Sequence, residues 1–256
     1  MNYSYTKEKA WPQYLIPCLF MAIVFFIHQQ NLQISFYLAG LLMLTLVFFN
    51  ERNRIVLWMS IAYLFGHLLY LYANKFVDVT DVSLPSKILL NRLLLICNLI
   101  PISIIYYSFI KEKLVKLMYD RPIRLNKRVM LVLVLLFSLP VLVILLNKPI
   151  TLPLLTYGLL FCFLHAALQE LIWRGILLRA LTIQSTQTTA ILTSGIGFGI
   201  TQSTVGFQLY SSILFCFLGS FFAWLTIKTG SLVPSFLLFY YLSFLLVLSG
   251  VIFIGF

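Results

Sequence analysis

Apolar residues occur along this chain in long runs that are separated by short polar segments. A run of roughly 17–23 residues is long enough to cross a hydrocarbon core about 30 Å thick as a helix. The pattern therefore predicts an all-α fold, that of a polytopic helical membrane protein with eight or nine transmembrane helices. Their predicted ranges are 11–28, 34–49, 55–73, 88–110, 129–146, 151–168, 189–203, 209–227 and 232–255.

Two polar stretches, 74–87 and 111–128, connect neighbouring groups of runs. The second carries seven Lys and Arg residues against two acids, and it divides the chain into two parts. We expect residues 1–128 to form N-terminal transmembrane helices with a basic cytoplasmic loop. Residues 129–256 are expected to form a second transmembrane domain.

Composition and charge fix the class of protein and its orientation. Hydrophobic residues make up 61% of the chain and charged residues 10%, a composition that excludes a soluble protein. Cytoplasmic loops of membrane proteins collect Lys and Arg, and a cytoplasmic N-terminus places 14 of the 18 such residues on that side. We therefore predict a multi-pass plasma-membrane protein with its N-terminus in the cytoplasm. The net charge of +11 is explained by those loops, so no nucleic-acid partner is expected.

The two ends of the chain give two further expectations. Lys7 and Lys9 precede the first apolar run, but no small-x-small cleavage site follows it, so we expect this run to be retained as a span. The chain stops at 251–256 without a polar or basic flank. We expect the natural chain to continue into a C-terminal tail.

Cysteine and histidine give no sign of a metal centre. The cysteines lie in separate apolar runs, and the sequence has neither a Cys-x-x-Cys pair nor a His-Glu-x-x-His motif. We therefore predict no metal and no cofactor.

Two ionisable residues stand out between the apolar run 150–168 and Gly175. Glu170 and Arg174 are four positions apart, and charged groups at membrane depth are costly. At this spacing a carboxylate and a guanidinium share one helix face and can form a charge-assisted pair. We predict that the pair holds the helix bundle together.

Small residues recur at helical spacing in the next two runs. Gly195 and Gly199 lie on one face of the run 189–203, and Gly219 and Ala223 repeat the pattern on the following run. Small faces let membrane helices approach closely, so we predict that these four residues pack inside the bundle.

Three stretches between roughly 150 and 245 resemble the CAAX-protease and bacteriocin-processing (Abi) family of intramembrane enzymes. The segment Gln-Glu-Leu-Ile-Trp-Arg-Gly at 169–175 is similar to the family signature, in which two adjacent glutamates precede an arginine and a glycine. Each stretch departs from the catalytic pattern. Gln169 replaces the first glutamate, Gln202 and Phe239 replace two histidines, and Ser243 replaces an asparagine.

The resemblance implies the family's helical bundle, while the four replacements remove its chemistry. An amide at position 169 cannot accept a proton from water. Losing even one oxyanion-type donor costs roughly 10²–10³ in rate. We therefore predict a pseudoprotease that is not an enzyme. The alternative is an active intramembrane endopeptidase that uses Glu170, and a transporter is a weaker third possibility because Asp and Lys are absent from the predicted spans.

Within that family, the degenerate motifs are similar to the lysostaphin-resistance and surface-protein-display group of membrane proteins of Gram-positive cocci. This resemblance implies a role in cell-envelope biogenesis. It also implies a partner, a membrane-anchored peptidoglycan hydrolase of the glucosaminidase type. Residue spacing by itself names no partner.

Overall fold

The computed structural model describes residues 54–111, 150–202 and 209–255, together with residues 17–22, 24, 25, 40, 41, 44, 135, 139 and 143. Throughout this part of the chain the regular elements are helices. In chain order they are α3 (Arg54–Val79), α4 (Leu84–Leu93), α5 (Ile96–Ile110), α8 (Leu152–Glu170), the π-helix η1 (Leu171–Leu177), α9 (Leu178–Gln184), α10 (Gln187–Thr201), α11 (Leu209–Thr229) and α12 (Val233–Leu248).

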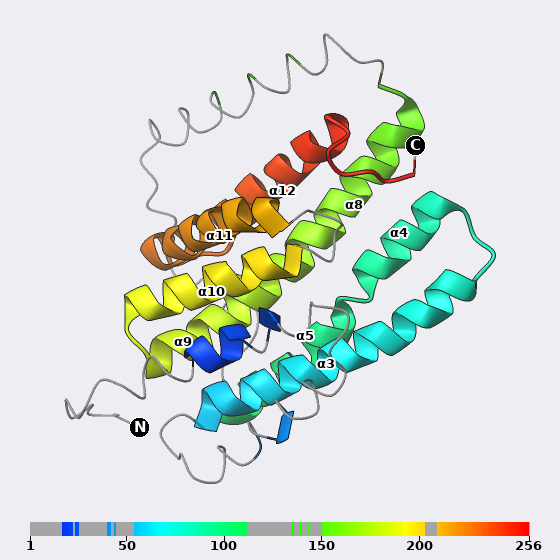
Figure 1. Ribbon diagram of the computed structural model, residues 1–256. Helices are drawn as coiled ribbons and strands as arrows, with labels where there is room; N and C mark the ends of the chain where they lie inside the picture. The colour runs from blue at the N-terminus through cyan, green and yellow to red at the C-terminus, as the bar shows by residue number, and fades with distance from the viewer. Residues whose placement is uncertain are drawn as a thin grey trace.

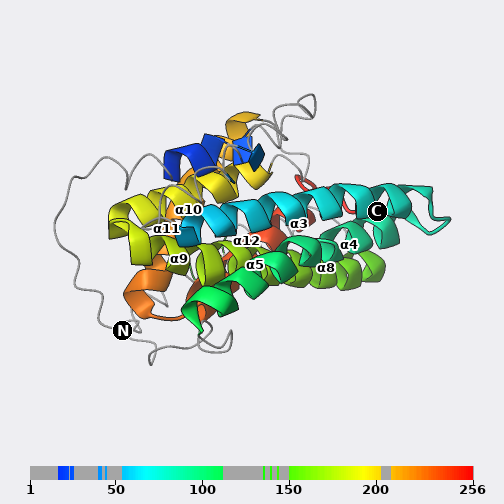
Figure 2. The ribbon, with the colours of Figure 1, turned by 90° about the horizontal axis from the view of Figure 1, so that it is seen from below.

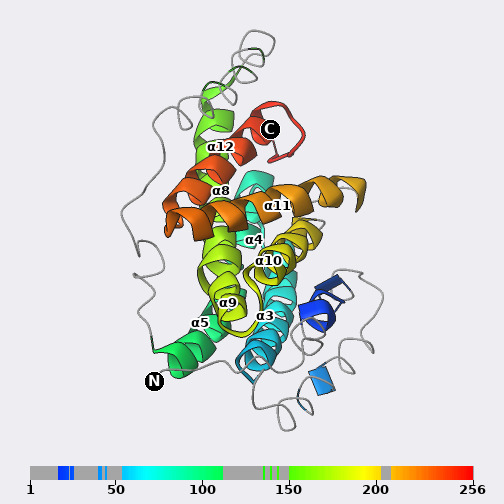
Figure 3. The same ribbon diagram turned by 90° about the vertical axis from the view of Figure 1, so that its left-hand side faces the viewer.

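One long helical stretch, α8 followed by η1 and α9, runs through the middle of the described bundle (Figure 1). Helices α3, α4 and α5 lie on one side of it, and α10, α11 and α12 lie on the other. Figure 3 shows α11 crossing α8 steeply. The most extensive contacts join α10 to α11, α3 to α5, and α8 to α12. The central stretch therefore touches both groups of helices.

Local sequence signals set where several of these helices begin. The Thr151 side chain accepts a hydrogen bond from the Leu154 amide at 3.4 Å, and Thr186 accepts one from the Thr189 amide at 3.2 Å. Both threonines satisfy amide groups that a helix N-terminus leaves unpaired. Pro234 lies in the first turn of α12, where its missing N–H costs nothing.

One end of the bundle brings together helix ends that are far apart in sequence. Near the start of α3, the Val56 amide donates to Gln184 Oε1 at 3.3 Å, at the end of α9. The ends of α5 and α11 meet α9 around a cavity that Ile110, Arg179 and Lys228 help to line. This end therefore carries basic residues from several helices.

The opposite end holds the connection between α3 and α4, which projects beyond the neighbouring helices in Figure 2. Gly255 packs against Pro85 there, so the last described residues return to the start of α4. Ile252 and Ile254 are buried in a cluster with Phe161 of α8. At this end, therefore, the last described residues pack on α4 and α8 through apolar contacts.

The described helices confirm that this is a membrane protein. Four stretches are long and apolar enough to cross a bilayer, namely Arg54–Val79, Leu84–Ile110, Leu152–Gln184 and Ser212–Thr229, and the apolar helix Val233–Leu248 is shorter. The number eight or nine is not confirmed. Most of the predicted spans 11–28, 34–49 and 129–146, and all but one residue of the loop 111–128, lie outside the described residues.

Three predicted ranges do not coincide with single helices, although the span 88–110 lies within the apolar stretch Leu84–Ile110. The segment 74–87 is mostly helical, because α3 continues to Val79 and α4 begins at Leu84. Asn74 and Asp78 share a hydrogen bond of 3.5 Å within this extension, so polar side chains support the helix beyond the apolar run. The range 88–110 contains two helices, and the range 232–255 is helical only to Leu248. Hydropathy reports membrane depth, whereas helix ends depend on capping and turns.

The orientation stays a prediction that labelling can test. In a cysteine-free background, we expect an impermeant maleimide to modify Asp81→Cys in intact cells and to leave Lys111→Cys and Asn126→Cys unmodified. The reason is that Lys and Arg of short loops stay on the cytoplasmic side. Permeabilised cells, in which all three sites should react, provide the control. Modification of Asn126→Cys in intact cells would contradict a cytoplasmic N-terminus.

Candidate functional site

Glu170 and Arg174 form a buried ion pair at the junction of α8 and η1. Arg174 Nη1 lies 3.1 Å from Glu170 Oε1, and the two side chains are 0% and 2% exposed, with the arginine first. Both oxygens of Glu170 are closed to solvent. The Ser235 side chain of α12 also lies beside the carboxylate. The ion pair therefore lies inside the bundle, next to helix α12.

Arg174 has three further contacts, all with helices α10 and α11. Its Nη2 donates to the Gly219 carbonyl oxygen at 3.3 Å. The guanidinium carbon lies 3.9 Å from the centre of the Phe198 ring and 5.5 Å from that of Phe222. Aromatic faces attract a desolvated guanidinium, so the charge is stabilised by one carboxylate, one carbonyl and two rings.

The backbone around the pair is a π-helix over Leu171–Leu177. Such segments are rare and often mark functional sites, because they change the direction of side chains relative to the flanking α-helix. The Ser194 hydroxyl of α10 donates to the Trp173 carbonyl at 2.9 Å, and Gly197 leaves room for the Trp173 ring. The π-helix is therefore fixed against α10 at Trp173, the residue before Arg174.

Phe239 lies at the centre of an aromatic cluster. Its ring centre is 5.1 Å from that of Phe198, 5.9 Å from that of Phe222, and 5.4 Å from that of His165. Ser243, one turn further along α12, is also buried. Phe239 therefore carries a ring packed on three others.

Two positions that are predicted from the sequence to be replaced, Gln169 and Gln202, lie near His165. The His165 imidazole lies next to the side-chain amide of Gln202, yet His165 Nδ1 and both amide atoms of Gln202 are buried without a hydrogen bond of good geometry. Gln169, one turn after His165 on α8, lines a small cavity with Asn98 and Thr201. The site thus combines an ion pair, packed rings and several poorly satisfied polar groups.

Glycines bring α10 and α11 into close contact behind the ion pair. A methyl group at Gly195 would lie 2.6 Å from Ser220 Cα, and one at Gly199 would lie 2.7 Å from Cys216 Cα. A methyl group at Gly219 would lie 2.8 Å from the Gly195 carbonyl oxygen. Ala223, one turn after Gly219, is fully buried. The four small residues predicted to pack lie at or near this contact.

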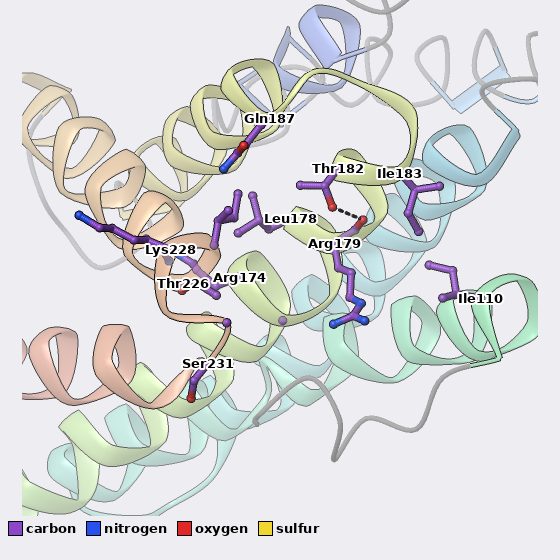
Figure 4. A pocket seen from close by; sticks show the side chains of 13 residues that line it. Ile110, Arg174, Leu178, Arg179, Thr182, Ile183, Gln187, Thr226, Lys228 and Ser231 are labelled. Carbon is purple, nitrogen blue, oxygen red and sulfur yellow. Dashed lines mark hydrogen bonds between the residues drawn. The ribbon is translucent and has the colours of Figure 1, made fainter. Parts of the chain in front are cut away.

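A larger cavity of about 630 Å³ opens at the basic end of the bundle, beside η1 and α9 (Figure 4). Arg174 and Gly175 form part of its wall. Figure 4 shows Arg179 among the lining residues and Lys228 pointing away from the cavity. The ammonium group of Lys228 lies 4.5 Å from the centre of the Trp224 ring. The charged head of Arg174 is directed to Glu170, and the rest of the lining combines Arg179 and Gln187 with apolar and hydroxyl side chains.

Three residues of the site were not assigned to it from the sequence. His165 could have been assigned from its spacing, because it is a polar residue one helical turn before Gln169. Arg92 and Asn98 are polar residues within the predicted span 88–110, and the structure buries both. Arg92 faces the Phe161 ring at 5.9 Å. In the part of the chain that is described, no three His, Cys, Asp or Glu residues gather as metal ligands would.

Comparison with known proteins gives one match. Residues 151–245 match the family model described as "Type II CAAX prenyl endopeptidase Rce1-like". No curated protein and no solved structure matches the chain. The matched segment runs from the start of α8 into α12 and contains Glu170, Arg174, Gln169, Gln202, Phe239 and Ser243. Over these residues, this membrane protein is similar to the Rce1-like CAAX prenyl endopeptidases, which confirms the resemblance at the level of the family.

Proposed function

We propose that this protein is a non-catalytic, protease-like scaffold of the plasma membrane. The observation that carries the proposal is the state of Glu170, the one acid of the family signature that the chain retains. Both of its carboxylate oxygens are buried, and Arg174 lies 3.1 Å away. A general base must reach a water molecule and be free to take its proton, and this carboxylate is closed off and paired.

The residues around Glu170 support the same proposal. Gln169 and Gln202 carry neutral amides where the family signature has an acid and a histidine, and neither amide can act as a base near neutral pH. Phe239 packs on Phe198 and Phe222, so rings occupy the space between the ion pair and His165. An active endopeptidase that uses Glu170 would need both water and room at this position.

The partner that we propose is a membrane-anchored peptidoglycan hydrolase of the glucosaminidase type. This part of the proposal rests on the sequence resemblance to surface-protein-display membrane proteins. In the bilayer a partner helix would meet exposed helix faces, and association there depends on close packing and hydrogen bonds. The exposed face of α11 carries Phe217, Phe221 and Trp224 and offers one such surface.

Absence of proteolysis is the direct test of the scaffold. The purified protein in lipid should cleave neither prenylated peptides nor leader-type peptides, because its site lacks a free base. An active member of the family, assayed under the same conditions, is the positive control that shows the assay can detect cleavage. Cleavage by the wild type that disappears in Glu170→Gln, in a variant that still unfolds cooperatively, would overturn the proposal in favour of the endopeptidase.

Photocrosslinking can locate the partner. A photoreactive residue at Phe217 on α11 should capture the single transmembrane helix of the hydrolase, whereas one at Ile104 on the exposed face of α5 serves as a comparison. Capture at Phe217 and not at Ile104 supports the α11 surface, whereas capture at Ile104 alone places the contact on α5 and contradicts it. If a scan of all described helices captures only lipid while a pull-down still recovers the hydrolase, recognition lies outside these helices and the proposed surface is wrong.

A further inference from the structure

A small cavity lies beside Gln169, between the central helix and the N-terminal helices. Its volume is about 20 Å³, and its polar lining includes, besides Tyr63 and Trp173, five residues from four helices: His67 and Tyr70 of α3, Asn98 of α5, Gln169 of α8 and Thr201 of α10. Four helices thus contribute to it. Three of these five residues precede the segment 151–245 that matches the protease family.

Two amides at this cavity are incompletely satisfied by the protein. Asn98 and Gln169 are each only 3% exposed, and among the described residues Asn98 Oδ1 and Gln169 Oε1 have no hydrogen-bond partner. Leaving a buried polar group unpaired costs roughly 1–3 kcal/mol. Two such groups facing one polar cavity call for a ligand that can hydrogen-bond to both.

The packing of α3 on α5 fixes Asn98 in this place. A methyl group at Gly66 would lie 2.6 Å from Asn98 Cα and 2.7 Å from the Cys97 carbonyl oxygen. Pro101, four residues after Cys97 within α5, has no N–H to donate to that carbonyl. The absence of a side chain at Gly66 therefore lets α3 approach the part of α5 that presents Asn98.

We propose that this cavity binds one ordered water molecule that bridges the side-chain amides of Asn98 and Gln169. A cavity needs about 10–15 Å³ and two to four polar partners to hold a water molecule, and both conditions are met. Water both donates and accepts, so it satisfies either orientation of each amide. A larger polar ligand exceeds the volume, and an apolar ligand would leave the amides unpaired.

A chain of polar side chains connects the cavity to the projecting end of α3. The Tyr70 hydroxyl, at the cavity, donates to Asn91 Oδ1 at 3.1 Å. Asn91 Nδ2 in turn donates to Asn74 Oδ1, and Asn74 Nδ2 donates to Asp78 Oδ2 at 3.5 Å. Asp78 is exposed. Hydrogen-bonded polar groups, which are rare at membrane depth, therefore extend from the cavity wall to the exposed end of α3.

The bridge couples two parts of the chain. Asn98 belongs to the N-terminal helices, and Gln169 belongs to the protease-like segment. In our proposal the amide that replaces the first glutamate of the family signature has a structural task, because it holds water between α5 and α8. This inference does not depend on whether the protein cleaves peptides or binds a hydrolase.

Radiolytic hydroxyl-radical footprinting of the full-length protein in lipid nanodiscs tests the bound water. Radicals formed from an internal water oxidise side chains next to it, even when those side chains are buried. Tyr63 lines the cavity, and Tyr106 is equally buried but does not line it. We expect oxidation of Tyr63 to exceed that of Tyr106 at least several-fold, and oxygen-18 water should be incorporated. Equal protection of both tyrosines would overturn the proposal.

A second experiment replaces the amides of Asn98 and Gln169 by apolar side chains of similar shape. If water bridges the two amides, Asn98→Leu and Gln169→Met should each lower Tm. The Tm of the double variant should be little lower than that of either single variant. Oxidation of Tyr63 should fall to the level of Tyr106 in all three variants. If the amides are merely unpaired, each replacement removes an unsatisfied group and should raise Tm independently. A rise in Tm for both single variants, with unchanged Tyr63 oxidation, would exclude the bridging water.

Discussion

Arg174→Leu is expected to lower the free energy of unfolding by about 3–5 kcal/mol, the range for removing one partner of a fully buried ion pair. The cause is the carboxylate left behind. Glu170 would then be buried without its cation, and Arg174 would no longer donate to the Gly219 carbonyl or cover the Phe198 ring. Thermal and denaturant unfolding in a mild detergent should show the loss directly.

The double variant Glu170→Gln with Arg174→Leu distinguishes the pair from simple loss of packing. We expect it to be more stable than Arg174→Leu, because no charge remains to be buried. Lys228→Leu is the matched control, since Lys228 is an exposed cation whose contact is the Trp224 ring. Its removal should change stability by less than about 1 kcal/mol. Equal losses in the single and double variants would show that Glu170 and Arg174 do not stabilise each other.

The positions of the central helices follow from local sequence, but the π-helix does not. Long apolar runs and the caps at Thr151 and Thr186 are visible in the sequence, and helices start within a few residues of the predicted positions. The segment Leu171–Leu177 has no sequence signature of its own, because its π geometry is held by contacts such as Ser194 to the Trp173 carbonyl. Those contacts join residues that are far apart in sequence.

In the candidate site too, features that depend on local sequence could be predicted, and features that depend on the packing of distant helices could not. Glu170 and Arg174 could be paired from their spacing, because both residues lie on one helix. The contribution of Asn98 could not be predicted, because it depends on how α5 packs on α3 at Gly66 and how both meet α8. The family resemblance predicts that Gln169, Gln202, Phe239 and Ser243 are replaced positions, and this stays a prediction. That Phe239 packs on three other rings is a property of the assembled helices.

Close packing of α10 on α11 leads to the second large expected effect. Gly195→Ala and Gly199→Ala should each destabilise the protein by about 1–3 kcal/mol, the usual cost of overpacking a well-packed core. The added methyl groups would meet backbone atoms of Ser220 and Cys216, which can move only if the helices separate. Separation would also draw the Gly219 carbonyl away from Arg174, so the loss should extend to the ion pair.

Gly40→Ala is the control for the helical preference of alanine, which favours Ala over Gly by roughly 1 kcal/mol in a helix interior. Gly40 is helical, and nothing lies within 4 Å of the position that its methyl group would take. We therefore expect Gly40→Ala to leave Tm unchanged or raise it, while Gly195→Ala and Gly199→Ala lower it. A Tm for Gly195→Ala equal to or above that of Gly40→Ala would mean that α10 and α11 are not held in contact at these glycines. In that case the hydrogen bond from Arg174 to the Gly219 carbonyl oxygen could not be a fixed part of the site.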